Sequence, residues 1–208
     1  YVDDKGNFIV SDGTGAVDDL YAERTPGWGI GGGGQKLNVD YGVMELDGNK
    51  VIANWYEGPA EGEVCTSRFF FWADTTYDIT NWQYIELDVY ISDASAANGK
   101  TFYIDLSSDE NWILGEMSRI TLKAENWTNG WNHIKVALDQ LHPANGTLNP
   151  TKWDFIRFYF TGTGEGNPAA SYTVAEGETF IFALDNVKFT EPKPEKPDAK
   201  HEIYEFEV

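Results

Sequence analysis

The stretch YIELDVYI, residues 84–91, alternates apolar and polar side chains without a break. Ile85, Leu87, Val89 and Ile91 fall on one side of an extended chain, and the residues between them fall on the other. A period of two is the pattern of a β-strand that has one face on a core and the other toward solvent. The stretch therefore predicts a sheet that covers a hydrophobic interior.

The same alternation recurs in residues 101–106, 133–138 and 154–160. Turn-forming Asn-Gly and glycine-rich pairs separate the strands. None of the segments of 11 or more residues has the apolar spacing of an amphipathic helix. The pattern predicts an all-β fold, a two-sheet antiparallel β-sandwich, with a jelly roll as the first choice of topology. Further strands are predicted at residues 8–10, 36–44, 50–56, 66–72, 112–122 and 179–189.

The composition is that of a folded chain rather than a disordered one. The 208 residues are 41% hydrophobic and 15% aromatic, enough to bury a sizeable core. A net charge of −19 repels phosphate backbones and anionic membrane surfaces, so we expect no nucleic-acid partner. No apolar stretch approaches 18 residues, so we also expect no membrane insertion. The same charge favours a neutral or cationic ligand.

Two segments break the strand pattern. Residues 27–34 contain six glycines and are predicted to form a flexible loop. Residues 191–197, EPKPEKP, are typical of a stiff extended linker. We therefore predict a sandwich module over residues 1–190 and a linker with a C-terminal tail over residues 191–208. The linker indicates that the module is part of a larger modular chain. We expect the module itself to be monomeric.

Several segments, taken in order, resemble the galactose-binding-like β-sandwich carbohydrate-binding modules of bacterial polysaccharide-degrading systems. The resemblance covers about residues 17–190 and rests on the order of the segments rather than on any one motif. It implies a secreted, extracellular or cell-surface module, of the kind found in cellulosomes, without catalysis of its own. The segments are DDL at 18–20 with GW at 27–28, GNKVI at 48–52, DITNWQYIELDVY at 78–90, GWNHIKV at 130–136, WDFIRF at 153–158 and LDNVKF at 184–189.

In modules of this kind one sheet carries the ligand. The resemblance implies that this front sheet is built from residues 66–72, 101–106, 112–122 and 154–160. Sugars stack their C–H faces on aromatic rings, and their hydroxyls pair with carboxylate, amide or guanidinium groups. The alternative is that some of the rings belong to the core or are covered by loops. The candidate ligand-binding residues are Arg68, Phe70, Trp72, Tyr103, Asp105, Trp112, Arg157 and Tyr159.

The resemblance also implies a structural calcium ion. Asp185 in the closing strand would bind it together with Asp18 or Asp19 from the first strand, and Asp47 is a further candidate. Calcium takes six to eight oxygen ligands, and this chain is rich in carboxylates. The alternative is that Asp185 is an ordinary polar residue at a turn or edge.

No catalytic residue is predicted. Glu86 and Asp88 resemble the start of the Glu-x-Asp-x-x-Glu motif of one β-jelly-roll glycosidase class, but Ile91 stands where its last acid should be. Four other residues at strand edges are predicted to anchor the rim of the sandwich rather than to contact ligand. These are Trp82, Trp127, Trp131 and Trp153.

Three functions therefore stand open. The first is a non-catalytic module that binds a plant cell-wall polysaccharide, a β-glucan or a hemicellulose, and holds an attached enzyme or surface protein on it. The second is a structural or adhesive module without a sugar site. The third is a jelly-roll glycosidase or lyase with an unfamiliar pair of acids.

Overall fold

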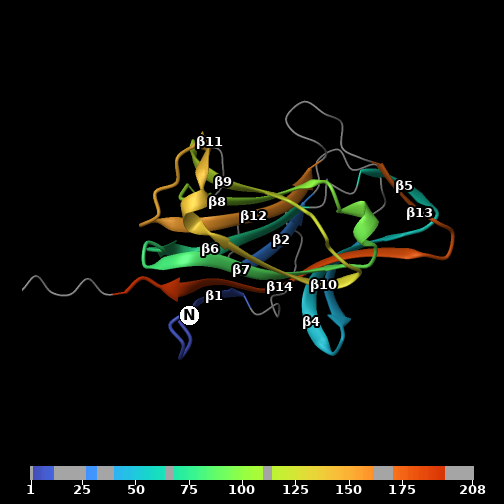
Figure 1. Ribbon diagram of the computed structural model, residues 1–208, viewed down its shortest axis with the longest axis horizontal. Coiled ribbons are helices and arrows are strands. Elements are labelled where there is room, and N and C mark those ends of the chain that lie inside the picture. The colour runs from blue at the N-terminus through green and yellow to red at the C-terminus, as the bar shows by residue number, and fades with distance from the viewer. Residues whose placement is uncertain are drawn as a thin grey trace, which may run out of the picture.

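A computed structural model describes residues 2–11, 27–31, 40–63, 68–109, 114–161 and 171–194. These residues form two antiparallel sheets that pack face to face (Figure 1). The predicted all-β, two-sheet antiparallel sandwich is confirmed. Within this part of the chain, no helix is long and apolar enough to cross a lipid bilayer.

The back sheet has the strand order β10-β7-β14-β4-β3, and β1 pairs with β14 outside this path. Every pair in it is antiparallel. Its strands are β10 (Gly130–Ala137), β7 (Trp82–Ile91), β14 (Thr179–Pro192), β4 (Asn49–Glu57), β3 (Asp40–Leu46) and β1 (Phe8–Ser11).

The front sheet has the order β11-β9-β8-β12-β6-β2, again antiparallel throughout. Its strands are β11 (His142–Gly146), β9 (Glu116–Lys123), β8 (Thr101–Ser107), β12 (Trp153–Thr161), β6 (Arg68–Tyr77) and β2 (Gly27–Gly31). A small sheet and two short helices complete the described elements: β5 (Ala60–Glu63), β13 (Ser171–Val174), η2 (Ala94–Ala96) and η3 (Leu138–Gln140).

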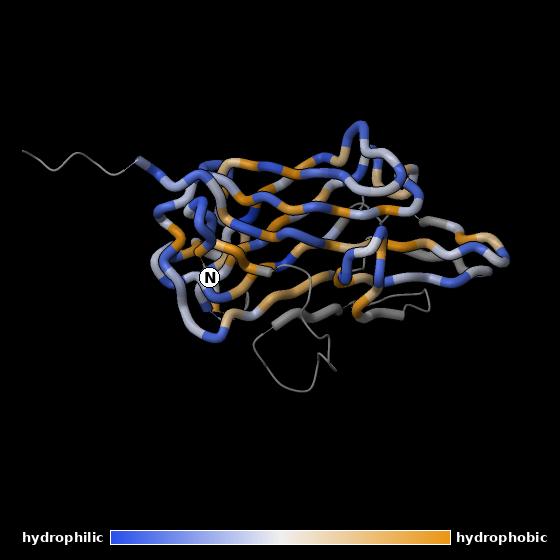
Figure 2. The backbone as a smooth tube through the Cα atoms, turned by 90° about the horizontal axis from the view of Figure 1, so that it is seen from below, coloured by the Kyte–Doolittle hydropathy of each residue, from blue (hydrophilic) through white to orange (hydrophobic). Residues whose placement is uncertain are grey.

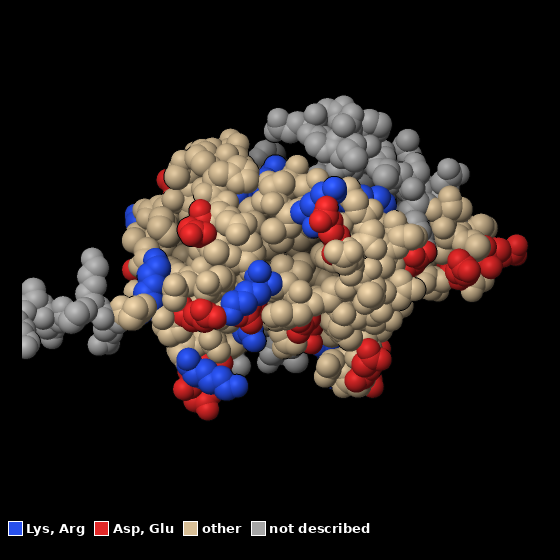
Figure 3. Space-filling view, in the orientation of Figure 1, with Lys and Arg blue, Asp and Glu red and all other residues tan. Residues whose placement is uncertain are grey.

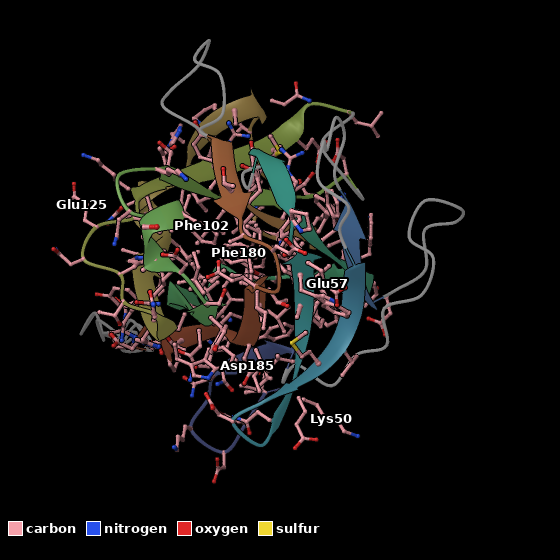
Figure 4. All side chains as sticks on the ribbon, turned by 90° about the vertical axis from the view of Figure 1, so that its right-hand side faces the viewer. Lys50, Glu57, Phe102, Glu125, Phe180 and Asp185 are labelled. Atoms are coloured by element: carbon pink, nitrogen blue, oxygen red, sulfur yellow. The ribbon has the colours of Figure 1, made fainter. Side chains whose placement is uncertain are left out.

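The hydrophobic core lies between the two sheets, where alternate side chains of both meet. Figure 2 shows apolar and polar residues alternating along the strands. In Figure 4, Phe102 and Phe180 lie in the interior, whereas Lys50 and Glu125 point away from it. Each large apolar side chain buried here stabilises the fold by about 1.5–3 kcal/mol. Fully buried neighbours include Leu87, Val89 and Ile91 from β7, Ile104 and Leu106 from β8, and Ile156 and Phe158 from β12.

The strands predicted from alternation all exist, and their bounds shift by a few residues. The first residues of the predicted strands 36–44, 66–72 and 112–122 lie outside the described residues. Residue 138 begins η3 instead of ending a strand. Four short strands were not predicted: β2, β5, β11 and β13. The sequence of β11, HPANG, reads as a turn, and its ladder is indeed irregular between Pro143 and Asn145.

The glycine-rich prediction is wrong in part. Residues 27–31 form the edge strand β2, paired with β6, rather than a flexible loop. Glycine weakens a strand because it loses more conformational entropy on folding than other residues do. Trp28 and Ile30 nevertheless alternate with the glycines, and the ladder pairs them with Phe71 and Phe69 of β6. The rest of the predicted loop lies outside the described residues.

The predicted domain boundary after residue 190 falls inside β14, which continues to Pro192. Pro192 lies opposite Trp82 at the end of the ladder, where the missing N–H costs little. Beyond it, the backbone N–H of Lys193 donates to the carbonyl of Asn81 at 2.6 Å. The sandwich therefore includes the first residues of the predicted linker, and residues 195–208 lie outside the description.

Candidate functional site

Strands β9, β8, β12 and β6 lie side by side in the front sheet. Their registers place Arg119, Asp105, Arg157 and Phe70 directly opposite one another, in one row across the four strands. Directly opposite residues project to the same face of a sheet. This face, named the front face, points away from the core because the alternate residues, such as Ile104, are buried between the sheets.

Two further rows flank the first one. At the β2 edge, the positions opposite Phe70 and Trp72 are glycines, so β2 itself carries no side chain there. One flanking row consists of Tyr159, Tyr103 and Thr121, and the other of Trp72, Phe155, Ser107 and Met117.

A buried ionic cluster occupies the centre of the front face. Asp105 has no exposed surface and accepts hydrogen bonds from two arginines. Arg119 donates from Nε to Oδ1 at 2.6 Å and from Nη2 to Oδ2 at 3.1 Å. Arg157 donates to Oδ2 from Nε at 2.8 Å and from Nη2 at 2.5 Å. One carboxylate thus balances two guanidinium groups, and the three side chains carry a net charge of +1.

Two tyrosines hold the guanidinium groups in place. The Cζ atom of Arg119 lies 4.1 Å from the ring centroid of Tyr103, and that of Arg157 lies 4.8 Å from the ring centroid of Tyr159. The rings of Tyr103 and Tyr159 pack edge to face at 5.1 Å. Arg119 Nη2 also donates to the Tyr159 hydroxyl at 2.6 Å. Stacking and hydrogen bonding together fix the planes of both arginines.

The pKa of Arg119 responds to these surroundings. Burial lowers it, but the hydrogen bonds to Asp105 and the attraction of that carboxylate outweigh burial, so the pKa is raised above its ordinary value. The guanidinium therefore stays charged at all physiological pH values.

An aromatic group adjoins the ionic cluster. Phe70 and Trp72 are half-buried and stack at 5.6 Å with an interplanar angle of 23°. Phe155 packs beside them from the neighbouring strand β12, 5.9 Å from Phe70 and 5.4 Å from Trp72, and is only 1% exposed. The exposed edges of Phe70 and Trp72 thus form an apolar platform next to the charged centre.

The structure brings six of the eight candidate ligand-binding residues onto the front face. Tyr103, Asp105 and Arg157 are largely buried, however, with exposures of 9%, 0% and 6%. Asp105 binds Arg157, and Tyr103 packs against Arg119 and Tyr159. The side chain of Arg68 and all of Trp112 lie outside the described residues, although the register of Arg68, opposite Tyr159, is a front-face one. The half-exposed members are Phe70, Trp72 and Tyr159.

Sequence reasoning missed Arg119 and Phe155. Alternation could have found both, because Phe155 is two residues before Arg157 and Arg119 lies within the predicted strand 112–122. What alternation could not supply is the register that sets Arg119 opposite Asp105. Pairing between strands distant in sequence depends on the assembled sheet.

The predicted calcium ligands are only partly described. Asp18 and Asp19 lie outside the described residues. Asp47 is exposed and accepts a hydrogen bond from Trp131 Nε1 at 3.1 Å. Asp185 is buried, and its Oδ1 accepts the backbone N–H of Asn186 at 2.7 Å. Among the described residues, no three acidic, histidine or cysteine side chains gather as a metal site would require.

Glu86 and Asp88 lie on the outer face of the back sheet, among basic residues. Glu86 accepts from Lys135 at 2.9 Å and from the Thr190 hydroxyl at 2.7 Å, and Asp88 Oδ1 lies 2.7 Å from His133 Nδ1. Figure 3 shows further places where basic groups lie beside acidic ones on the side of the molecule that it draws. Glu86 and Asp88 thus take part in ion pairs at the surface.

The pKa of Glu86 also argues against acid catalysis. Burial raises this pKa, but the hydrogen bonds from Lys135 and Thr190 and the charges of Lys135 and Lys188 lower it more, to below the ordinary value. A general acid needs a raised pKa so that it carries a proton at working pH. Glu86 is instead held ionised.

The lowered pKa of Glu86 means that its contribution to stability depends on pH. Because the carboxylate is favoured in the folded state, its contribution is present above the pKa of the unfolded chain, about 4.3, and is lost as pH falls through the lower folded pKa. Glu86→Gln should cost about 1 kcal/mol at neutral pH, and the difference from wild type should shrink below about pH 4. Urea unfolding across pH checks this, with exposed Glu57→Gln as the control for removing one negative charge. A difference that stays constant with pH would contradict the pairing.

The sequence matches no protein-family model and none of the curated proteins. Its neighbours among solved structures include carbohydrate-binding modules. A family 30 module is 16% identical with a TM-score of 0.47, over 92% of this chain and 90% of that one. A family 28 module specific for non-crystalline cellulose is 18% identical with a TM-score of 0.48, over 79% and 87%.

A third neighbour, from work on the promiscuous specificity of β-sandwich carbohydrate-binding modules, is 12% identical with a TM-score of 0.46, over 91% of this chain and 63% of that one. At such identities and scores, what this chain binds has to be argued from its own residues.

The four edge tryptophans pack against the sandwich. Trp153 is fully buried, Trp82 and Trp127 pack against the core, and Trp82 Nε1 donates to the carbonyl of Gly6 at 2.9 Å. Trp131 is half-buried on the outer face of the back sheet, 5.3 Å from Tyr90. Trp131 and Tyr90 pack against a small second apolar cluster, which consists of the buried Val51, Ala53 and Ala183.

A separate pocket of about 440 Å³ opens at one end of the sandwich. Its wall combines apolar side chains such as Trp82, Leu141 and Leu148 with Asp139 and Lys193. It shares no residue with the front face. The volume is within the range of small-ligand sites, but the aromatic and ionic groups that suit a sugar chain lie on the front face instead.

Proposed function

We propose that this chain is a non-catalytic carbohydrate-binding module whose front face binds a plant cell-wall polysaccharide, a β-glucan or a hemicellulose. One observation carries the proposal: aromatic rings and a rigid arginine–aspartate cluster stand in adjacent rows on one face of one sheet. Groups arranged in rows across four strands suit an extended polymer better than a small molecule.

The chemistry of the face matches that of a sugar chain. The half-exposed edges of Phe70 and Trp72 offer flat apolar surface to C–H groups. Tyr159 and Arg119 offer polar atoms at the surface, and their positions are fixed by hydrogen bonds and stacking. Fixed side chains lose little conformational entropy when ligand binds, which favours affinity.

The biological setting that we propose follows from tethering. A monomeric, secreted module joined by a linker to an enzyme or cell-surface protein raises the concentration of that partner on an insoluble substrate. No chemical step is required of the module itself, and nucleic acid and membranes are not among the partners proposed.

Affinity electrophoresis of the wild-type module, in gels that each contain one soluble β-glucan or hemicellulose, tests the proposal. We expect retardation by at least one polysaccharide and no release of reducing ends from it. Release of new chain ends would favour the glycosidase or lyase alternative. Retardation by none would favour the structural or adhesive alternative, which the burial of Asp105 and Arg157 also suits, since a buried ion cluster can serve the fold alone.

A structural calcium ion is part of the proposal. Asp185 is a buried carboxylate that lies directly opposite Asp88 in the β14–β7 ladder. A calcium ion bound by Asp185, with Asp18 or Asp19 and Asp47 as further ligands, would balance the charge of this carboxylate.

Calcium is therefore expected to raise the melting temperature of the chelator-treated module, because an ion that binds only the folded state stabilises it. The increase should be lost in Asp185→Asn. Melting curves that coincide with and without calcium would remove the ion from the account.

A further inference from the structure

The arginines of this chain are concentrated on the front face. The sequence contains four arginines, and three of them, Arg68, Arg119 and Arg157, occupy front-face register positions. The chain as a whole has a net charge of −19, with only 15 basic residues against 34 acidic ones. A face enriched in arginine on so acidic a protein calls for an explanation beyond solubility.

Arg119 has donors to spare. Its Nε and Nη2 atoms bind Asp105 and Tyr159, but within the described residues Nη1 has no hydrogen-bond partner. The side chain is 17% exposed, so this end of the guanidinium reaches the surface. Stacking on Tyr103 keeps its plane fixed.

Arg119 shares the carboxylate that it contacts. Asp105 accepts hydrogen bonds from both Arg119 and Arg157, so the described residues neutralise the charge of Arg119 only in part. A sugar hydroxyl accepts a hydrogen bond from Nη1 without changing this charge. A carboxylate accepts the same hydrogen bond and also neutralises the charge, which makes the pair stronger than the hydrogen bond to a hydroxyl.

We propose that the polysaccharide bound by the front face contains uronic acid, and that Arg119 Nη1 binds its carboxylate. This inference rests on the proposed function and adds the substrate class. Phe70 and Arg119 stand at opposite ends of one row, three strand spacings or about 14 Å apart. The ligand is therefore an oligomer that spans the row, with one sugar ring stacked on the aromatic side chains and an acidic unit at Arg119.

The negative charge of the whole chain does not oppose this assignment strongly. At physiological ionic strength, exposed charges more than about 8 Å apart are largely screened. A carboxylate in hydrogen-bond contact with Arg119 is inside that distance and feels the local positive charge.

The test compares hexamers of β-1,4-linked glucose and β-1,4-linked glucuronate by isothermal titration calorimetry. We expect the glucuronate hexamer to bind the wild-type module at least about 10-fold more tightly, the gain of one charge-assisted pair. This advantage should fall as salt is added, which can be measured without any variant. Arg119→Met should remove the advantage, so that the two hexamers bind this variant within about 3-fold of each other.

Lys123→Met is the matched control. Lys123 is on the same strand, pairs with Glu125 at 3.1 Å in the exposed surface, and its loss changes the net charge equally. The control should keep the preference. Equal binding of the two hexamers, or a preference lost equally in Lys123→Met, would overturn the inference, and so would Arg119→Met weakening both hexamers alike.

The two proposals fail separately. A module that binds a neutral polysaccharide but not the glucuronate hexamer refutes the uronate inference and leaves the proposed function intact. A module that binds neither hexamer nor any polysaccharide in the gels contradicts both proposals.

Discussion

Asp105→Ala is expected to destabilise the folded module by about 3–5 kcal/mol, as large an effect as any single substitution predicted for this chain. The substitution removes the carboxylate that Arg119 and Arg157 share and leaves their charges facing each other on the front face. Arg157 has a side-chain exposure of only 7%, so water cannot take the place of the carboxylate without local opening. Urea unfolding at neutral pH measures the cost.

An exposed ion pair supplies the comparison for Asp105. Glu125 pairs with Lys123 at 3.1 Å, and both side chains are more than half exposed. Glu125→Ala should change the stability by less than about 1 kcal/mol. If Asp105→Ala lowered the free energy of unfolding no more than Glu125→Ala does, the ionic cluster would not stabilise the front face as the account requires.

Trp153→Ala is expected to cost about 3–5 kcal/mol, the usual range for deleting a buried aromatic side chain. Trp153 is fully buried and packs 5.2 Å from Phe189, 6.2 Å from Phe8 and 6.3 Å from Phe71. It therefore joins β12 of the front sheet to β14 and β1 of the back sheet. Removing it leaves a cavity where the two layers meet.

Trp153 also has an indole N–H that is buried without a hydrogen-bond partner. Trp153→Phe removes that unsatisfied group together with part of the ring, so it should cost clearly less than Trp153→Ala, about 2 kcal/mol or below. Equal losses of stability in the two variants would show that the polar atom is satisfied in solution. Thermal and urea unfolding of both variants decide between these outcomes.

The fold could be predicted from sequence because its signal is local. The alternation in residues 84–91 and 101–106 depends only on which side chains face the core. Short edge strands carry no such signal: Gly27–Gly31 and His142–Gly146 have turn-like compositions and become strands because a neighbour offers unpaired backbone groups.

The candidate site was predictable only in part. Alternation gave the face on which Phe70, Asp105 and Arg157 lie, but not that Asp105 binds two arginines at once. That arrangement depends on the register between β8, β9 and β12, which loop lengths and packing decide after the strands form. Burial of the cluster follows from the same contacts and was therefore invisible in the sequence.

The central claim, that carbohydrate binds on the front face, is tested most directly by two half-buried tryptophans on opposite sides of the sandwich. Trp72 lies on the front face, and Trp131 lies on the outer face of the back sheet. In a gel containing a polysaccharide that retards the wild-type module, the account predicts that Trp72→Ala loses the retardation and that Trp131→Ala, folded by its circular dichroism, keeps it. Retention by Trp72→Ala, or loss in Trp131→Ala alone, would contradict the account.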